Sequence, residues 1–486
     1  MSHQIRSSQR RTFLKTAAAG AVLGSTSLAF AENSSDNQAS SGRSGQLPDT
    51  IRGEVLQTNG TLSLDQHTFV ESQREIPVAG RTQVIVCGGG PAGIAAALSA
   101  ARAGVDVRLI ELAGCLGGVW TAGLLTKILD TSGKSGIMAE LLKIFAERGS
   151  AVARDTAGTV YDPEVAKLVL EELLVDAGVK ILLHTRVVGA VTNKENCLAA
   201  IVTESKSGRQ AWVADRFIDC TGDGDLAAQA GCRFDVGVGI DCACQPMSML
   251  ALLTGVNPEA VREYIRETGP SAKPRLLDLM ENAGINPSYR APTLRHLHSG
   301  VYSLMTNHEY GVSAFDAQAI SDATIRGRRE VHEIINGLRK LGGPWKDLAV
   351  VATAEQIGVR EGRRIRGRYQ ITADDLAKGL RHKEAVCRAT FPIDVHALSM
   401  AGSREIDQSF KHGGLKPYDI PYPALVAADV DGLLMAGRCI SGDFVAHSSY
   451  RVTGNAVAMG EAAGLAAAKS VKLGLLPHEL SWDQIS

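Results

Sequence analysis

The chain has 486 residues, of which 45% are hydrophobic and 21% are charged, a composition that excludes a disordered or collagen-like protein. Its 51 Lys and Arg residues balance 52 Asp and Glu residues, so the net charge of −1 provides no basic field for binding nucleic acid. Glycine is enriched, with 51 residues in the chain against a usual fraction of roughly 7%, and this enrichment requires a local explanation.

The first 31 residues have the pattern of an export signal. Arg10 and Arg11 precede an apolar run that ends in the small-x-small triplet Ala29-Phe30-Ala31, typical of a cleavage site. The segment resembles a bacterial twin-arginine signal; the alternative is a basic amphipathic arm. The resemblance implies that the twin-arginine export machinery carries the folded protein out of the cytoplasm, and we expect it in the periplasm.

Residues 32–50 are rich in Ser, Asn, Gly and Gln and show no apolar periodicity, which predicts a flexible linker. After the signal, no stretch approaches the length of about 18 apolar residues that a membrane-spanning helix requires. We therefore expect no stable membrane span.

A glycine-rich turn between a strand and a helix is the clearest motif. Residues 82–87, TQVIVC, predict a buried parallel strand, and the helix that follows should end near Gly104. A second strand is expected over 105–110, and the acid after it is placed to bind an adenosine ribose. The strand, turn, helix, strand and acid predict a dinucleotide site, but this order alone leaves NAD and FAD open. The expected cofactor residues here are Gly88, Gly90, Gly93 and Glu111.

Three later segments resemble FAD-dependent oxidoreductases of glutathione-reductase fold. They read GCLGGVWTAGLL from Gly114, RFIDCTGDGD from Arg216, and GLLMAGRCISGDFVAHSSYRVTGNAVAMGEAAGL from Gly432. The resemblance implies FAD as cofactor, with the helix that starts near Thr453 directed at the flavin ring. It adds the expected cofactor residues Gly117, Gly118, Thr221, Gly222, Gly437, Arg438 and Gly454.

The segments at 359–376, 391–396 and 418–426 also resemble one broad, often exported, bacterial group of these flavoproteins. The disulfide reductases carry a Gly-Asp pair where this chain has Gly437-Arg438, and Asp443 follows only six residues after Gly437. The chain also lacks a C-x4-C motif after the glycine turn. Disulfide reduction is therefore not the expected reaction.

Four side chains are candidates for chemistry: His447, Arg451, Arg360 and Arg364. A histidine can accept a substrate proton or orient the substrate, and an arginine can bind a substrate carboxylate. The alternatives are an ordinary buried histidine, a loop-capping arginine and a solvated charge run. The nine cysteines include Cys242-Ala243-Cys244, but a single C-x-C pair predicts no metal site.

The sequence predicts an α/β fold: a doubly wound, FAD-binding Rossmann-like domain over 82–239 and 350–474, with an inserted α+β substrate lobe over 240–349. In the lobe we expect a helix over 314–341 and strands over 246–253 and 301–305. The predicted activity is hydride transfer between FAD and a small organic substrate, with an unidentified electron acceptor. A noncatalytic flavin-binding or electron-carrier protein and an NAD-only dehydrogenase are the alternatives.

Overall fold

The computed structural model describes residues 60–65, 67–155, 158–402 and 416–485. All of them belong to one compact unit, Gly53–Ser486. The predicted export signal and linker lie outside the described residues. Within those residues, none of the helices combines the length and the apolar character needed to cross a bilayer.

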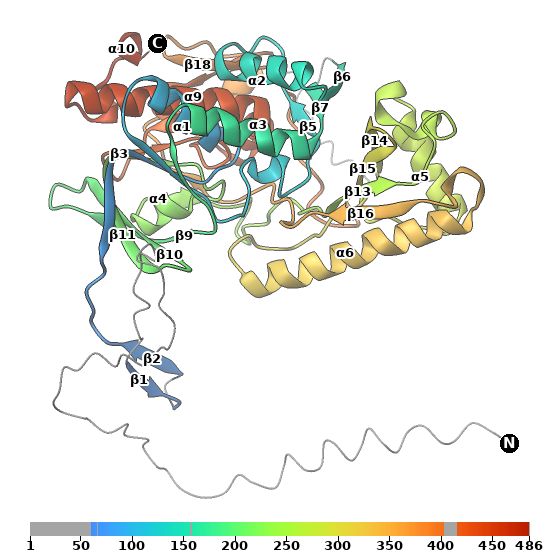
Figure 1. The fold of residues 1–486 in the computed structure, drawn as a ribbon, viewed down its shortest axis with the longest axis horizontal. Helices are drawn as coiled ribbons and strands as arrows, with labels where there is room; N and C mark the ends of the chain where they lie inside the picture. Colours follow the sequence, from blue (N-terminus) through green and yellow to red (C-terminus); the bar gives the residue numbers. More distant parts are fainter. Residues whose placement is uncertain (1–59, 66, 156–157, 403–415, 486) are drawn as a thin grey trace, which may run out of the picture. The chain divides into compact units, whose positions relative to one another are not determined.

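A seven-stranded sheet forms the base of the cofactor domain (Figure 1). Its four parallel pairs join β8 to β4, β4 to β3, β3 to β11 and β11 to β20, while β9, β10 and β11 form an antiparallel meander. The first part of β11 pairs with β10 and its end pairs with β20, so the carboxyl ends of β3, β4, β11 and β20 share one edge. The strands are β3 Val78–Cys87, β4 Val107–Ile110, β8 Lys180–Leu182, β9 Arg186–Thr192, β10 Leu198–Ser205, β11 Gly208–Asp219 and β20 Leu433–Met435.

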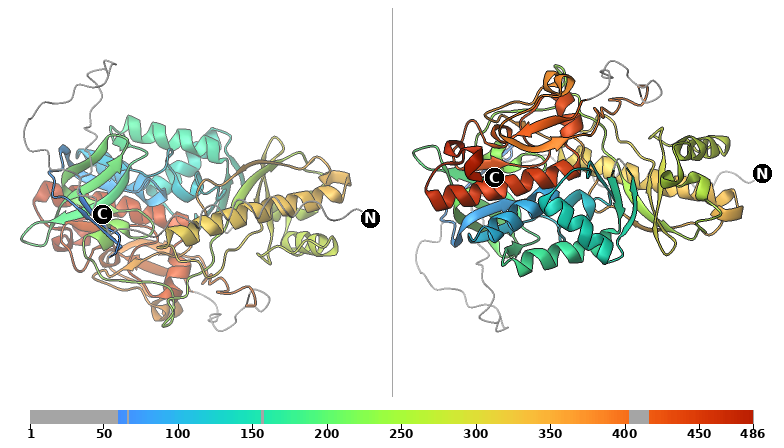
Figure 2. Two further views of the ribbon diagram at one scale, coloured as in Figure 1. Left: turned by 90° about the horizontal axis from the view of Figure 1, so that it is seen from below. Right: turned by 90° about the horizontal axis from the view of Figure 1, so that it is seen from above.

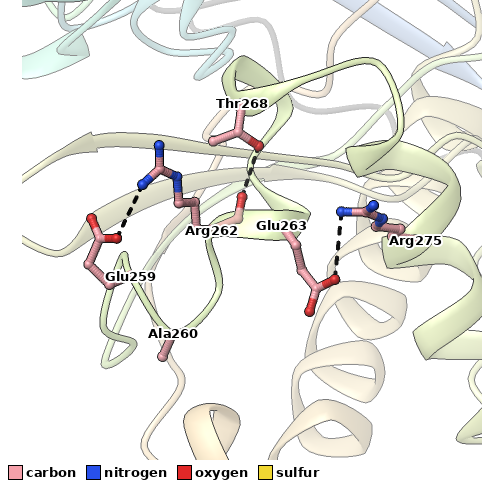
Figure 3. A pocket seen from close by; sticks show the side chains of 6 residues that line it. All are labelled: Glu259, Ala260, Arg262, Glu263, Thr268 and Arg275. Carbon is pink, nitrogen blue, oxygen red and sulfur yellow. Dashed lines mark hydrogen bonds and ion pairs between the residues drawn. The ribbon is translucent and has the colours of Figure 1, made fainter.

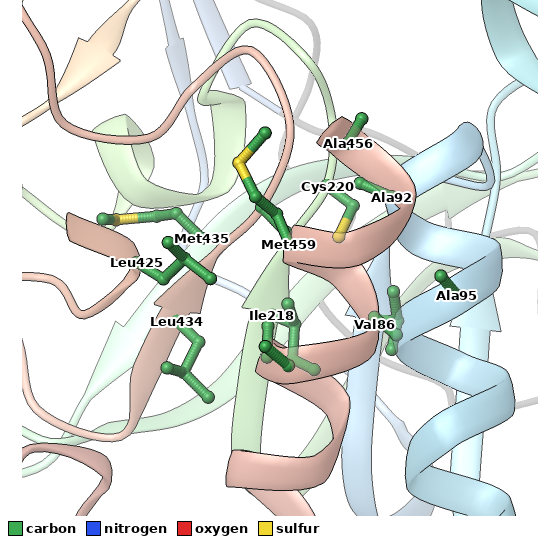
Figure 4. Close-up of a cluster of buried hydrophobic side chains, with 14 of the residues drawn as sticks. Val86, Ala92, Ala95, Ile218, Cys220, Leu425, Leu434, Met435, Ala456 and Met459 are labelled. Atoms are coloured by element: carbon green, nitrogen blue, oxygen red, sulfur yellow. The ribbon is translucent and has the colours of Figure 1, made fainter. Parts of the chain in front are cut away.

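Two helices far apart in sequence, α1 (Pro91–Arg102) and α9 (Thr453–Leu473), lie side by side in the views of Figure 2 and both pack on β3 and β11. Small residues permit this approach: a Cβ on Gly460 would lie 2.0 Å from the carbonyl oxygen of Ala92. Figure 4 shows Ala92 of α1 near Ala456 of α9 in the buried apolar cluster. The alanine- and glycine-rich sequence of both helices therefore brings their N-terminal ends together.

The inserted lobe contains a second, antiparallel sheet in the order β14, β15, β13, β16, with α6 packed on β16 (Figure 1). Its apolar core is separate from that of the cofactor domain. The last strand ends at residue 353, past the expected lobe boundary at 349, because it completes this sheet by pairing with β13. The elements are β13 Leu250–Thr254, α5 Ala272–Asn282, β14 Thr293–His298, β15 Val301–Met305, α6 Ala317–Lys340 and β16 Ala349–Thr353.

A three-stranded sheet, β5-β7-β6, connects the two cores. Leu124 and Val160 belong to the lobe core, and the hydroxyl oxygens of Thr126 and Ser303 are 2.6 Å apart. The remaining strands are β1 Gly60–Ser63, β2 Thr68–Glu71, β5 Lys127–Leu129, β6 Ala151–Asp155, β7 Gly158–Tyr161, β12 Phe234–Asp235, β17 Arg364–Ile365, β18 Ala385–Ala389 and β19 Tyr418–Pro421. The remaining α-helices are α2 Gly136–Glu147, α3 Pro163–Asp176, α4 Asp225–Gln229, α7 Ala373–Lys378, α8 Phe444–Tyr450 and α10 Trp482–Ile485, and short 3-10 helices include η1 Gly118–Trp120 and η2 Arg262–Tyr264.

Candidate functional site

The glycine turn after β3 is closely packed except at its middle position. Gly88 has φ of +99°, and a Cβ there would lie 2.3 Å from the carbonyl oxygen of Cys220. A Cβ on Gly93 would lie 1.8 Å from the carbonyl oxygen of Gly88. At Gly90, the N-cap of α1, a Cβ would meet no atom within 4 Å, and no side chain caps the helix. The space beside Gly90 therefore adjoins uncapped N–H groups, which favour a phosphate.

The second glycine cluster lies directly against the first. The Gly117 amide donates to the carbonyl oxygen of Gly89 at 2.8 Å, and a Cβ on Gly118 would lie 3.0 Å from Gly90 Cα. The Glu111 carboxylate accepts hydrogen bonds from the amides of Gly89 and Ala113. Burial raises the pKa of Glu111, and these backbone donors act against that shift. The predicted ribose-binding acid and both glycine clusters thus share one site.

Replacement of Glu111 by alanine is expected to weaken FAD binding by roughly 10- to 150-fold, the range of one lost hydrogen bond to a charged group. Equilibrium titration of the apoprotein with FAD measures this change. Glu140, a half-buried residue of α2 that pairs with Arg102 of α1, supplies the control variant Glu140→Ala. Equal affinity in wild type and Glu111→Ala would contradict the assignment of Glu111 to the ribose.

The ends of β11 and β20 form the adjacent wall of the site. Fully buried Asp219 accepts hydrogen bonds from the amides of Thr221 and Ala227, at 3.0 and 2.8 Å. Arg438 Nη2 donates to Asp223 at 2.8 Å and would lie 2.7 Å from a Cβ on Gly222. Arg438 therefore binds the loop after β11. Of the neighbouring residues, Gly437 packs beside Ala92 at the start of α1, and Asp443 caps α8 by accepting from the Ala446 amide.

Asp219 predicts a pH-dependent stability. Burial raises its pKa from 3.8 to about 6, against its hydrogen-bond donors. The pKa of Asp219 is higher in the folded state than in the unfolded state. The stability that the protonated Asp219 contributes is therefore fully present below about pH 4 and is lost as the pH rises through about 6. The free energy of unfolding of wild type relative to Asp219→Asn should fall by about 2 kcal/mol between about pH 4 and pH 8. Urea unfolding at both pH values measures it, and a pH-independent difference would contradict it.

Buried polar atoms of the segment 441–455, which leads into α9, have no hydrogen-bond partner among the described residues. Buried polar atoms are almost always hydrogen-bonded, so this group indicates a polar ligand. The pKa of the fully buried His447 lies well below its usual range. The cause is burial first and then the charges of Arg451, Arg364 and Arg438, while the backbone of Arg438 opposes the shift. The atoms are Ser441 Oγ, His447 Nδ1 and Nε2, Thr453 Oγ1, and Asn455 Oδ1 and Nδ2. Gly454 lies among these residues, and a Cβ there would lie 2.3 Å from the Asp130 carbonyl oxygen.

Arg360 and Arg451 belong to a polar cluster that joins the cofactor domain to the lobe. Arg451 Nη1 donates to the carbonyl oxygen of Arg360 at 3.2 Å. We call the whole group the arginine–histidine cluster: Tyr289, His308, Tyr310, Arg360, Asp394, His396 and Arg451.

On the lobe side of the cluster, Arg360 Nη2 donates to His308 Nε2 at 3.1 Å. His308 Nδ1 therefore carries the proton and donates to the Tyr310 oxygen at 3.2 Å. Tyr289 covers the His308 ring with its centroid 4.2 Å away. Burial, followed by the charge of Arg360, lowers the pKa of His308 far below its usual range. His308 is thus held as a neutral ring.

On the other side, Asp394 links Arg451 to His396. Arg451 Nη2 donates to the Asp394 carbonyl oxygen at 2.9 Å, and His396 Nε2 lies 3.3 Å from Asp394 Oδ2. Burial by itself would raise the pKa of Asp394. The hydrogen bond with His396, followed by the charges of His396, Arg451 and Arg360, outweighs burial and lowers this pKa. Burial, then Arg360, lowers the pKa of His396 to about 4, so its ring is neutral near neutral pH.

Arg364, the fourth predicted catalytic residue, does not join this cluster. Its guanidinium binds the Glu361 carboxylate and donates to the Gly237 carbonyl oxygen at 2.9 Å. The side chains of Arg364 and Glu361 are only 4% and 0% exposed to solvent. The second Glu361 oxygen accepts from the Gln245 amide at 3.1 Å. The structure therefore places Arg364 in a buried ion pair that fixes the chain around 237–245.

A surface hollow of about 380 Å³ lies on the lobe and is formed by residues of the segment 259–275 (Figure 3). Its charges pair with one another, Arg262 with Glu259 and Arg275 with Glu263. The hollow contains none of the residues of the glycine turn or the arginine–histidine cluster, so we do not assign the reaction to it.

All nine cysteines are free thiols, including the pair Cys242 and Cys244. Over the described part of the chain, no three His, Cys, Asp or Glu side chains are grouped as metal ligands.

The sequence predictions missed the lobe's contribution to the cluster. Tyr289, His308 and Tyr310 come from loops flanking β14 and β15. The polar run TNHEY at 306–310, directly after an apolar strand, was the available signal for two of them. Asp394 and His396 lie in the segment 391–396, which resembles the flavoproteins, but they are far from Arg451 in sequence and no local pattern predicts that they meet it.

Comparison with known proteins gives one family. The model of the FAD dependent oxidoreductase family matches residues 83–486. No curated protein matches the chain.

Solved structures with similar folds are distant in sequence. p-Nitrophenol 4-monooxygenase PnpA from Pseudomonas putida DLL-E4 is 12% identical, with a TM-score of 0.46 over 83% of this chain and 82% of that one. A geranylgeranyl bacteriochlorophyll reductase-like protein from Thermoplasma acidophilum is 13% identical, with a TM-score of 0.43 over 81% and 80%. The flavin-dependent brominase Bmp2 is 11% identical, with a TM-score of 0.44 over 81% and 80%.

Proposed function

Because the chain belongs to the FAD dependent oxidoreductase family, we propose that it transfers a hydride between FAD and a small organic substrate bound at the arginine–histidine cluster. The observation that carries this proposal is the hydrogen bond between Arg451 and Arg360. It connects the lobe, through Arg360 and His308, to a residue two positions before α9 begins. A substrate at the cluster would therefore lie between the lobe and the polar residues at the start of α9.

The described residues fit the family's cofactor, FAD. The open space at Gly90 and the uncapped start of α1 suit the pyrophosphate, and Glu111 suits the adenosine ribose. The unpartnered polar atoms of Thr453 and Asn455 suit the ring carbonyl and nitrogen groups of the flavin. When bound, FAD supplies two-electron chemistry as a hydride acceptor or donor.

The chain's own residues would then bind and orient the substrate. Arg360 and Arg451 are cations in this site. Burial is the main cause that lowers the pKa of both guanidinium groups, but the pKa of Arg451 falls only to about 10, so this group stays protonated at neutral pH. The rings of Tyr289 and His308 pack against each other and would form one side of the substrate site. His447, on which the charges of Arg451 and Arg438 act, remains a predicted orienting or proton-accepting residue.

Anaerobic absorption spectra test the proposal. The oxidised holoprotein is mixed with separate hydroxy acids, alcohols and amines, and dithionite serves as the chemical reductant. We expect the flavin absorbance to bleach with dithionite and with at least one organic compound. Bleaching by dithionite alone would contradict hydride transfer and favour the noncatalytic electron carrier.

We also propose that residues 1–31 direct export of the folded protein to the periplasm. The pair Arg10-Arg11, followed by the apolar run and the Ala29-Phe30-Ala31 triplet, supports this proposal. Fractionation of bacteria that express the full chain should place a shortened protein outside the cytoplasm, and Arg10→Lys/Arg11→Lys should retain it inside. Equal distribution of the two forms would contradict twin-arginine export.

A further inference from the structure

We infer that the substrate is an α-hydroxy carboxylate, that Arg360 and Arg451 bind its carboxylate, and that His396, oriented by Asp394, accepts the hydroxyl proton. This inference rests on the proposed function and assigns the substrate class and the proton acceptor.

The charge of the cluster favours an anion. Among the described residues, Arg360 bonds only neutral groups: the Pro246 carbonyl oxygen at 2.6 Å, the Ser248 hydroxyl at 2.9 Å and His308. Arg451 donates to two carbonyl oxygens, and its nearest carboxylate oxygen, Asp394 Oδ2, is 3.8 Å away. Each guanidinium has five N–H groups, so donors remain for a carboxylate.

A further cation lies at the edge of the cluster. Lys273 Nζ is 5.9 Å from the centre of the Tyr289 ring. Burial first, and then Arg295 and Arg266, lower the pKa of Lys273 to about 8, which leaves it mostly protonated at neutral pH. Arg360, Arg451 and Lys273 thus all interact with the Asp394 carboxylate, while Glu361, the other carboxylate that acts on Arg451, is paired with Arg364. This excess disfavours a substrate ammonium group, so a hydroxy acid fits better than an amino acid.

His396 is the side chain whose surroundings suit a proton acceptor. Its Nε2 lies 3.3 Å from Asp394 Oδ2, which fixes the proton on Nε2 and leaves the lone pair on Nδ1. Its backbone amide donates to Gln245 Oε1 at 3.0 Å, which holds the residue in place. The centroid of the His396 ring is 5.1 Å from that of the His308 ring, so both rings belong to the same cluster. A bound carboxylate would offset the arginine charges that keep His396 from accepting a proton.

The oxidation balances with these groups. The substrate C–H bond would break with its electron pair leaving as hydride to bound FAD, and the O–H bond would break with its proton passing to His396 Nδ1. The carbon–oxygen bond would become a carbonyl, so the product would be an α-keto carboxylate and the two electrons would be held by the flavin. The short separation of Arg360, His308 and His396 suits a hydroxyl next to the carboxylate.

The test is anaerobic mixing of the oxidised holoprotein with lactate, glycolate and mandelate, each compared with propylene glycol and alanine. We expect flavin bleaching by a hydroxy acid and not by propylene glycol or alanine. Bleaching only by neutral alcohols or amines would overturn this inference while leaving the proposed function standing. Bleaching by dithionite alone would overturn both.

Variants separate binding from proton transfer, with oxamate as a non-oxidisable probe that perturbs the flavin spectrum. Arg360→Met and Arg451→Met should weaken oxamate binding by roughly 10- to 150-fold. His396→Gln and Asp394→Asn should retain oxamate binding but slow bleaching by about 100- to 10,000-fold. Arg262→Met, at an exposed pair on the lobe surface, is the matched control and should change neither. Unchanged bleaching in a His396→Gln protein that still holds FAD would overturn the assignment of the proton acceptor.

Discussion

Replacement of Gly90 by valine is expected to weaken FAD binding at least about 100-fold while the apoprotein stays folded. A Cβ at this position meets no atom within 4 Å, and the backbone φ of −73° is open to any residue. The protein therefore has no packing reason to require glycine here. The added side chain would instead occupy the space where backbone N–H groups approach the pyrophosphate, so charge-assisted hydrogen bonds would be lost.

Two further glycines make this test specific. Gly93→Ala should prevent folding of the same turn, because its Cβ would lie 1.8 Å from the Gly88 carbonyl oxygen. Gly269→Val, in open space on the lobe, is the matched control and should leave both FAD binding and stability unchanged. FAD titration and urea unfolding measure the two properties. Full FAD affinity in Gly90→Val would show that the cofactor lies elsewhere.

Removal of Glu361 is expected to destabilise the protein by about 3–5 kcal/mol, because it leaves the buried Arg364 guanidinium without its counter-charge. It also removes the acceptor of the Gln245 amide, so the segment that supports His396 should loosen. The double variant Glu361→Leu/Arg364→Met replaces both charges with apolar groups and should recover most of the loss. Urea unfolding of the single and double variants measures the difference.

Variants of the same two residues test whether Arg364 takes part in the reaction, as the sequence analysis predicts. If Arg364 only stabilises the fold, Arg364→Met should lower the free energy of unfolding, and the double variant should still bleach with substrate. If the double variant is as stable as wild type but does not bleach, Arg364 contributes to the reaction and the structural assignment is wrong.

The cofactor domain was predictable because its motifs are local. The Gly88 turn, the strand before Glu111 and the helix that begins at Thr453 each carry their pattern within a short segment. The family match and the fold confirm FAD and the α/β architecture. The ends of the elements were predicted less accurately. Strand β3, expected to begin at Thr82, begins four residues earlier at Val78, because β11 pairs with it along this extra length.

The arginine–histidine cluster was only half predictable because it is assembled by long-range contacts. Arg360 meets a residue of the lobe 52 positions away, and Arg451 meets Asp394 across 57 positions. No short pattern contains both members of such a pair. Arg364 is the opposite case, because its ion-pair partner, Glu361, lies only three residues away in sequence.

The absorption spectrum of the purified full chain, followed by identification of the released flavin, tests the central claim most directly. We predict a yellow protein that releases FAD on denaturation, and an apoprotein that regains the flavin spectrum when FAD is added. A colourless protein that neither contains FAD nor takes it up would contradict the assignment of the glycine turn, Glu111 and the start of α9 to the cofactor.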